Sequence, residues 1–105
     1  MSLQGQTNGQ FREHVKERIK IKEPKQYRVI MHNDDFTSME FVVDILMHIF
    51  HKDPLEAERL MLLVHKSGRA AVGAYPYDLA VTKVQAASDQ AKKEGFPFRM
   101  TVEEA

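Results

Sequence analysis

Apolar and polar residues alternate along the chain from Tyr27 onward, which is the pattern of a half-buried β-strand. Tyr27, Val29 and Met31 would lie on one face of this strand, and the residues between them on the other face. The polar run at 33–35 consists of residue types that favour turns, so we expect the strand to end there.

Two amphipathic helices are predicted next, because apolar residues recur every three or four positions. Thr37 and Glu40 have the spacing of a capping box, which marks where the first helix begins. Asp53 and Pro54 provide a start signal for the second helix, and Gly68 provides its end signal. The expected inward faces are Val42, Ile45, Leu46, Ile49 and Phe50 in the first helix, and Ala57, Leu60, Met61 and Val64 in the second.

The remaining pattern predicts two further strands and one further helix. Alternation at 70–74 predicts a strand, and residues 75–77 are expected to form a turn. Small apolar residues at helical spacing across 80–91 predict a third helix, which a glycine and a proline shortly after it would end. Alternation at 98–102 completes the pattern with a final strand.

The element order β-α-α-β-α-β predicts an α+β fold, in which three helices cover one side of a small three-stranded antiparallel sheet. Residues 1–25 are polar, of mixed charge and without a core pattern, so we expect a flexible N-terminal tail before a single core domain at 26–105. Phe11, Val15 and Ile19 recur every four residues. A short amphipathic helix that forms against an apolar surface is therefore the alternative to a solvated leader.

Composition narrows the classes of function. The chain has 15 basic and 15 acidic residues, so no net charge attracts nucleic acid or an anionic membrane over long range. The absence of cysteine excludes disulfides, thiolate metal sites and a cysteine nucleophile, and it suits a reducing compartment. We find no phosphate-binding glycine loop, no nucleophile elbow and no apolar run of about 18 residues, the length of a membrane span.

The densest polar cluster, formed by Asn33, Asp34, Asp35 and Thr37, has two interpretations. Asn and Asp side chains bond their own backbone in turns, so the cluster can be purely structural. Carboxylate and amide oxygens at the mouth of an apolar groove would also suit an ammonium group, which brings three donors and a positive charge. The second interpretation makes the cluster a site for the amino end of a peptide.

Two rival interpretations invoke catalysis or metal binding. Asp34 and Asp35 could act as an acid–base pair with His65 as a proton shuttle, although adjacent residues in one turn usually diverge. His65 lies one position beyond the inward stripe of its helix and could equally be a structural histidine. His48 and His51 are spaced i, i+3, but two histidines without further ligands are weak evidence for a metal. We therefore predict no metal and no cofactor.

Three separated motifs resemble the ClpS family: "NDDFTSMEFV" at 33–42, "LMLLVHKSGRA" at 60–70 and "TKV" at 82–84. The resemblance covers about residues 25–105. It implies a non-enzymatic adaptor of the bacterial or plastid N-end rule. Such an adaptor captures proteins that begin with Phe, Leu, Tyr or Trp and delivers them to a Hsp100 unfoldase of the AAA+ class, such as ClpA or ClpC. An inhibitory or structural partner of the unfoldase remains an alternative.

The resemblance also implies roles for individual residues. Asn33, Asp35 and His65 would bind the α-amino group and first peptide unit of the substrate, and Asp34 would order the turn. Asp78 and Lys83 would dock on the N-terminal domain of the unfoldase, which engages the tail during delivery. The implied hydrophobic pocket consists of Thr37, Met39, Val42, Met61, Val64 and Phe98, with Met39 as the gatekeeper against β-branched first residues.

Four positions depart from the family pattern: Ser38, Pro76, Val81 and Phe98. Phe98 replaces the usual leucine and would shrink the pocket, which favours Leu or Phe over Trp as the first residue. Val81 removes an acidic side chain beside the docking residues, and the choice between ClpA and ClpC stays open. A protein of this family is expected to be a monomer when free, in the bacterial cytoplasm or the plastid stroma.

Overall fold

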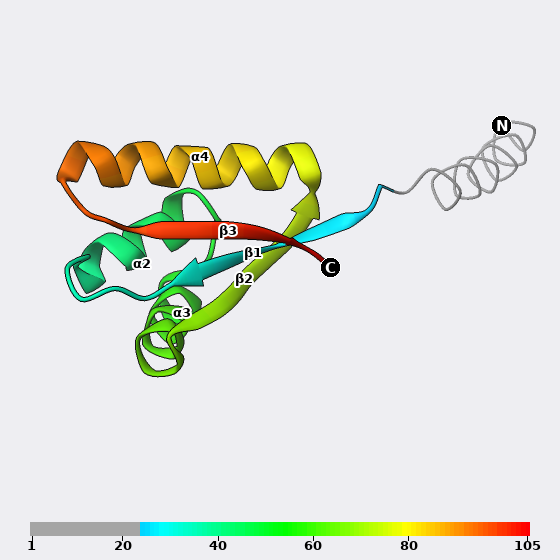
Figure 1. Ribbon diagram of the computed structural model, residues 1–105. Coiled ribbons are helices and arrows are strands. Elements are labelled where there is room, and N and C mark those ends of the chain that lie inside the picture. The colour runs from blue at the N-terminus through cyan, green and yellow to red at the C-terminus, as the bar shows by residue number, and fades with distance from the viewer. Residues whose placement is uncertain (1–23) are drawn as a thin grey trace, which may run out of the picture.

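The computed structural model describes residues 24–105, which form a three-stranded sheet and three helices (Figure 1). The predicted order β-α-α-β-α-β and the α+β class are confirmed. The expectations for the tail, including the Phe11, Val15 and Ile19 pattern, lie outside the described residues. The elements are β1 (Gln26–His32), α2 (Met39–His48), α3 (Pro54–Ser67), β2 (Arg69–Pro76), α4 (Tyr77–Glu94) and β3 (Arg99–Glu104).

The sheet has the order β2-β1-β3, and β1 is antiparallel to both neighbours. Val29 lies opposite Gly73 on one side and Val102 on the other. The next residue, Ile30, lies opposite Ala71, so Val72 is the extra residue of a β-bulge in β2.

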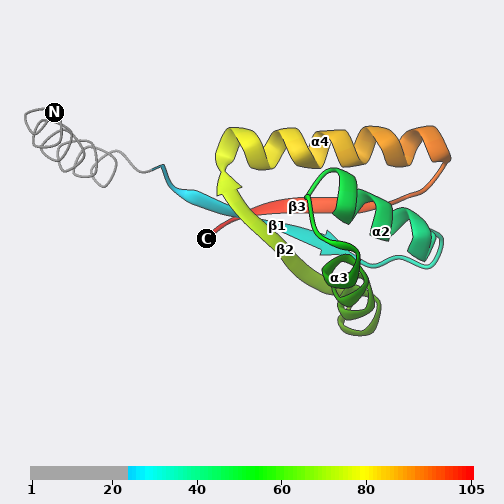
Figure 2. The same ribbon diagram turned by 180° about the vertical axis from the view of Figure 1, so that it is seen from behind.

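The helices pack on one face of this sheet. Helices α2 and α3 lie behind the strands in Figure 1 and in front of them in Figure 2, while α4 runs along β3 in both views. The predicted inward residues of α3 are all buried. In α2 the buried stripe begins at Phe41, which the expected stripe left out, whereas Val42 is only half-buried because it faces a cavity. The main core cluster includes Val29, Met31, Phe41, Ile45, Leu46, Phe50, Leu60, Val64, Val72, Phe98 and Met100.

Ile30 lies on the face of the sheet that the helices leave uncovered, yet it is only 4% exposed. The Arg69 guanidinium pairs with the Glu103 carboxylate at 2.6 Å. Arg69 is on β2 and Glu103 is on β3, so this ion pair crosses the central strand diagonally over Ile30. The aliphatic parts of long charged side chains cover apolar surface in this way.

Ser38, and not Thr37, caps helix α2. The Ser38 hydroxyl accepts a hydrogen bond from the Phe41 N–H at 3.1 Å. Thr37 is unavailable because its hydroxyl donates to Asp34 Oδ2 at 2.6 Å. The predicted capping box of Thr37 and Glu40 is therefore wrong: the helix is capped one residue later, because the preceding turn uses the Thr37 hydroxyl.

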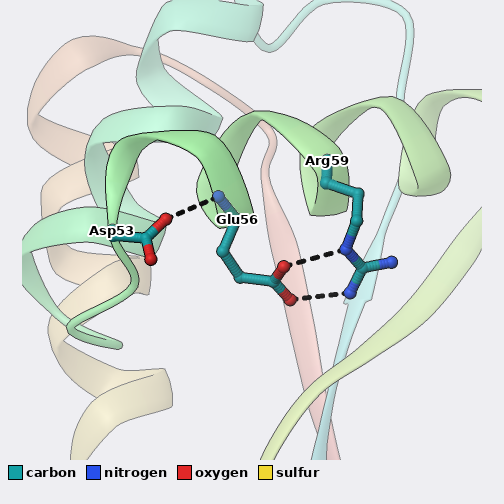
Figure 3. A network of polar contacts seen from close by, with 3 residues as sticks. All are labelled: Asp53, Glu56 and Arg59. Atoms are coloured by element: carbon teal, nitrogen blue, oxygen red, sulfur yellow. Dashed lines mark hydrogen bonds and ion pairs between the residues drawn. The ribbon is translucent and has the colours of Figure 1, made fainter.

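Helix α3 begins and ends at the predicted signals. The Asp53 carboxylate accepts a hydrogen bond from the Glu56 N–H at 2.8 Å (Figure 3). Pro54 occupies the first turn. Glu56 and Arg59 form two exposed hydrogen bonds one turn apart, a pair that contributes little stability in water. Gly68 takes the left-handed conformation with φ 87°, which ends the helix and starts β2 at once.

The predicted turn at 75–77 is wrong. β2 extends through Pro76, and α4 begins at Tyr77 with no intervening loop. Pro76 has φ −53° and ψ 151°, so its fixed φ fits both the end of a strand and the start of a helix. The Tyr77 ring packs edge-on against Tyr27 at 5.1 Å, which holds the start of α4 beside the start of β1.

Candidate functional site

A cavity of about 400 Å³ opens where β1 ends, between the turn that leads into α2 and the C-terminal half of α3. We call it the β1 pocket. It contains every residue that the sequence predicted for the α-amino site, the turn and the hydrophobic pocket. Its lining is His32, Asn33, Asp34, Asp35, Phe36, Thr37, Ser38, Met39, Val42, Met61, Val64, His65 and Phe98.

The inner part of the β1 pocket is apolar and tightly held. Val64 and Met61 project from α3, and Phe98 comes from the segment just before β3. Phe98 is 7% exposed, and its ring packs edge-on against Phe41 at 5.6 Å. Phe41 in turn packs against Phe96 at 5.1 Å. Because Phe41 is held by Phe96 and packs against Phe98, Phe98 cannot easily move aside for a larger occupant.

One backbone hydrogen bond brings the polar parts of the site together. The Asn33 N–H donates to the carbonyl of Gly68 at 2.8 Å, which ties the end of β1 to the end of α3. His65 stands in the last turn of α3, three residues before that glycine. The turn at 33–35 and the histidine therefore share one rim, although about 30 residues separate them in the sequence.

The Asp34 carboxylate organises this rim. It accepts hydrogen bonds from the Phe36 N–H at 2.8 Å, the Thr37 N–H at 2.7 Å and the Thr37 hydroxyl at 2.6 Å. Partial burial alone would raise the pKa of Asp34, but the hydrogen bonds from Thr37 and Phe36 outweigh it and hold the pKa below its ordinary value. Asp34 thus remains ionised and keeps the turn in one conformation.

The neighbouring carboxylate is not used in this way. Within residues 24–105, no hydrogen bond or ion pair engages the side chains of Asp35, Asn33 or His65, and both Asp35 and Asn33 are exposed. Acceptors that line a cavity without a partner in this part of the chain are available to a ligand that donates hydrogen bonds.

The acid–base interpretation fits this geometry poorly. Both oxygens of Asp34 are occupied by the turn, so this carboxylate is not free to exchange protons with a substrate. Asp35 would have to act alone. The arrangement favours binding over catalysis by a carboxylate pair.

Replacing Asp34 by asparagine is expected to lower the free energy of unfolding by about 1 kcal/mol at neutral pH, because a charged acceptor of three hydrogen bonds is lost while solvent screens part of the effect. A lowered folded-state pKa stabilises the protein fully above the ordinary Asp value of about 3.9, and this contribution disappears as the pH falls through the lowered pKa. Thermal unfolding of both proteins at neutral and acidic pH tests this. The difference should shrink below about pH 4, and a difference independent of pH contradicts it.

Three pocket residues were not predicted from the sequence. Phe36 is 78% exposed at the rim, in the middle of an otherwise polar turn, and its exposed ring was the signal that could have identified it. Ser38 lines the pocket as well as capping α2. His32 hydrogen-bonds the Thr101 hydroxyl at 2.8 Å. Burial lowers the pKa of His32, and the positive charges of Arg99 and Arg69, which lie opposite it, lower the pKa further.

Two further kinds of site, metal sites and membrane-spanning helices, were looked for among the described residues. The His48 Nδ1–H donates to the Asp44 carbonyl at 2.9 Å, within its own helix. In the described part of the chain, no three His, Cys, Asp or Glu side chains are grouped so that they could hold a metal ion. None of the helices between residues 24 and 105 is both long enough and apolar enough to cross a bilayer.

The two predicted docking residues lie on α4, away from the β1 pocket. Asp78 is exposed in the first turn of α4, near the start of β1, whereas the pocket lies at the other end of that strand, roughly 20 Å away along seven residues. Lys83 is half-buried, and its ammonium donates to the Ile49 carbonyl at 2.6 Å. The same ammonium lies 5.7 Å from the Phe50 ring centroid and 5.3 Å from that of Tyr75. Lys83 therefore connects α4 to the C-terminal end of α2.

Lys83→Met is expected to lower the free energy of unfolding by about 1–2 kcal/mol, because a helix-end carbonyl loses its donor and two rings lose a cation. Asp78→Ala is the matched control, since this exposed side chain makes no hydrogen bond within the described residues. Chemical denaturation of the two variants measures both free energies of unfolding. If Lys83→Met is as stable as the unmodified protein, Lys83 does not stabilise the fold.

Comparison with known proteins identifies the relatives of this chain. A family model described as "ATP-dependent Clp protease adaptor protein ClpS" matches residues 22–101. A ClpS adapter protein of Clostridium acetobutylicum is 46% identical over 94 residues, which are 90% of this chain and 93% of the relative. A ClpS adapter protein of Treponema denticola is 52% identical over 84 residues, covering 80% and 83% of the two chains.

A solved structure agrees with the sequence relatives. ClpS2 of Agrobacterium tumefaciens, bound to L-phenylalaninamide, superimposes with a TM-score of 0.75 at 38% identity and covers 78% of this chain and 99% of its own. The β1 pocket lies within residues 22–101, the region that the family model matches, as do α2, α3, β1 and β2. The chain belongs to the ClpS family of ATP-dependent Clp protease adaptor proteins.

Proposed function

We propose that this protein binds, in the β1 pocket, the free amino terminus of polypeptides that begin with Phe, Leu, Tyr or Trp, and delivers them to a AAA+ Clp unfoldase for degradation. One observation carries the proposal: a single cavity combines an apolar interior with a rim of acceptors that have no partner within residues 24–105. An amino-terminal residue with a bulky apolar side chain needs both features at once.

The chemistry of an α-ammonium group matches the rim. It offers three donors and a positive charge, for which the Asp35 carboxylate, the Asn33 amide oxygen and a neutral nitrogen of the His65 imidazole are suitable acceptors. An internal peptide N–H offers one donor and no charge. The rim therefore discriminates the first residue of a polypeptide from every later one.

The free energies of side-chain burial and hydrogen bonding are sufficient for an adaptor that binds transiently. Burial of a Leu or Phe side chain contributes about 1.5–3 kcal/mol, and each hydrogen bond to a charged group contributes a similar amount. Association entropy must then be subtracted. The net binding free energy is consistent with affinity in the micromolar range or somewhat tighter, so the polypeptide is bound and can still be released.

The ligand of the structural relative supports the same assignment. L-phenylalaninamide, bound to ClpS2 of Agrobacterium tumefaciens, has a free amino group, a benzyl side chain and an amide in place of the next peptide bond. It is thus a minimal model of a polypeptide that begins with Phe. The amino-terminal specificity of the present chain is inferred from this likeness together with its own pocket residues.

For delivery, we infer that the region of α4 around Asp78 and Lys83 contacts the N-terminal domain of the unfoldase. This region is separated from the β1 pocket by the length of β1, so a docked adaptor keeps its pocket open. Tyr77, Leu79 and Val81 are also exposed here and add apolar contact area. Val81 contributes no charge, which shifts the contact toward apolar packing.

A series of peptides that differ only in the first residue tests the proposal. Fluorescence anisotropy should show binding when that residue is Phe, Leu, Tyr or Trp, and weaker binding by about tenfold or more when it is Ser, Lys or Val. Addition of ClpA or ClpC with the peptidase should then give degradation of the bound class, and Asp78→Ala should reduce degradation without changing peptide affinity. Affinity that does not depend on the first residue refutes the proposal.

A further inference from the structure

Met39 differs from the other described methionines in its exposure. It is 46% exposed, whereas Met31, Met61 and Met100 are all exposed by 9% or less. Met47 is half-buried against the core. Among residues 24–105, Met39 is therefore the most exposed methionine, and exposure is a main determinant of how readily a methionine is oxidised.

Solvent reaches Met39 from two sides. The residue opens α2 directly after the Ser38 cap and lines the β1 pocket. It also lines a second cavity of about 370 Å³ between α2 and α3, which we call the α2–α3 groove. Only Met39 and Met61 belong to both cavities, and Met61 is largely buried. The exposed Met39 residue is thus part of the wall that a bound side chain would touch.

We propose that Met39 is an oxidation site through which a peroxide weakens the binding of amino-terminal residues in the β1 pocket, an inference that rests on the proposed function. The thioether sulfur attacks one oxygen of the peroxide, the O–O bond breaks, and an S=O bond forms. The sulfur loses two electrons, and the peroxide gains them. When the oxidant is hydrogen peroxide, one oxygen is transferred to the sulfur and the other leaves as water. Methionine sulfoxide reductases reverse the change, so the site acts as a switch.

The physical consequence follows from the two environments of the sulfoxide. In the free protein, water hydrogen-bonds the new S=O group, so the fold is not affected. When an apolar first side chain enters the β1 pocket, this polar oxygen loses water without gaining a donor. Binding is therefore weakened by about tenfold, which corresponds to about 1.4 kcal/mol, while the amine-binding rim remains intact.

The test uses the full chain, hydrogen peroxide and a Phe-led fluorescent peptide. Peptide mapping by mass spectrometry should show that Met39 gains one oxygen at lower peroxide doses than the other methionines in 24–105. Each protein is compared with its own untreated form. Treatment should lower the peptide affinity about tenfold for the unmodified sequence and leave it nearly unchanged for Met39→Leu. Met47→Leu should respond like the unmodified sequence.

Each outcome is decisive. Complete conversion of Met39 with unchanged affinity overturns this proposal and leaves the proposed function standing. Earlier oxidation of another described methionine also overturns it. If Met39→Leu loses affinity as strongly as the unmodified sequence, the effect comes from another residue, such as Met1, and the assignment to Met39 is wrong. If the untreated protein binds no Phe-led peptide, both proposals fail.

Discussion

Asp35→Ala is expected to weaken the binding of a Phe-led peptide by about 100-fold, or about 3 kcal/mol, because the α-ammonium loses its charged partner. Asp35 is, among the described residues that line the β1 pocket, the only carboxylate that accepts no hydrogen bond within residues 24–105. Asp35 is exposed and makes no hydrogen bond or ion pair within residues 24–105, so its removal should leave the melting temperature nearly unchanged. Isothermal titration and thermal unfolding of the same preparations separate the two effects.

The matched control is Asp44→Ala. Asp44 is an exposed aspartate on α2 that does not line the β1 pocket, so its removal changes the net charge equally and should leave affinity within about twofold. If Asp35→Ala and Asp44→Ala bind the peptide equally well, general electrostatic attraction explains the affinity, and Asp35 does not receive the amino group.

Phe98→Leu is expected to raise the affinity for Trp-led peptides, relative to Leu-led ones, by about tenfold, because a smaller side chain enlarges the inner end of the β1 pocket. The change should also destabilise the fold by about 1 kcal/mol, since the edge-on contact with Phe41 is lost. Competition between the two peptides for one labelled probe measures the ratio directly.

Phe96→Leu separates pocket shape from stability. Phe96 also packs against Phe41, at 5.1 Å, but it does not line the β1 pocket. A similar loss of stability is therefore expected, with no change in the ratio of the two affinities. If both variants shift the ratio equally, relaxation of the aromatic cluster and not the size of the pocket sets the preference.

Local signals in the sequence were sufficient for most of the fold. Asp53 with Pro54 begins α3 and Gly68 ends it as predicted, because caps depend on neighbouring residues alone. One error arose where two local signals competed. Thr37 could cap the helix or bond Asp34, and the structure uses it for Asp34 and caps with Ser38.

Contacts between distant residues could not be predicted from periodicity. The hydrogen bond from Asn33 to Gly68 joins two elements whose separation in space depends on how α3 packs on the sheet. The bond from Lys83 to Ile49 spans 34 residues in the same way. The family resemblance supplied the grouping of Asn33, Asp35 and His65 that local reasoning left open, and the cavity that these residues share is visible only in three dimensions.

Selection for a free amino terminus is the central claim, and one titration tests it most directly. A Phe-led peptide and its N-acetylated twin have the same side chain and differ in the charge and two donors of the amine. Our account predicts micromolar or tighter binding of the free peptide and, at concentrations about 100-fold higher, no saturable binding of the acetylated one. Comparable affinities for the two peptides would show that the β1 pocket recognises an apolar side chain and not the beginning of a chain.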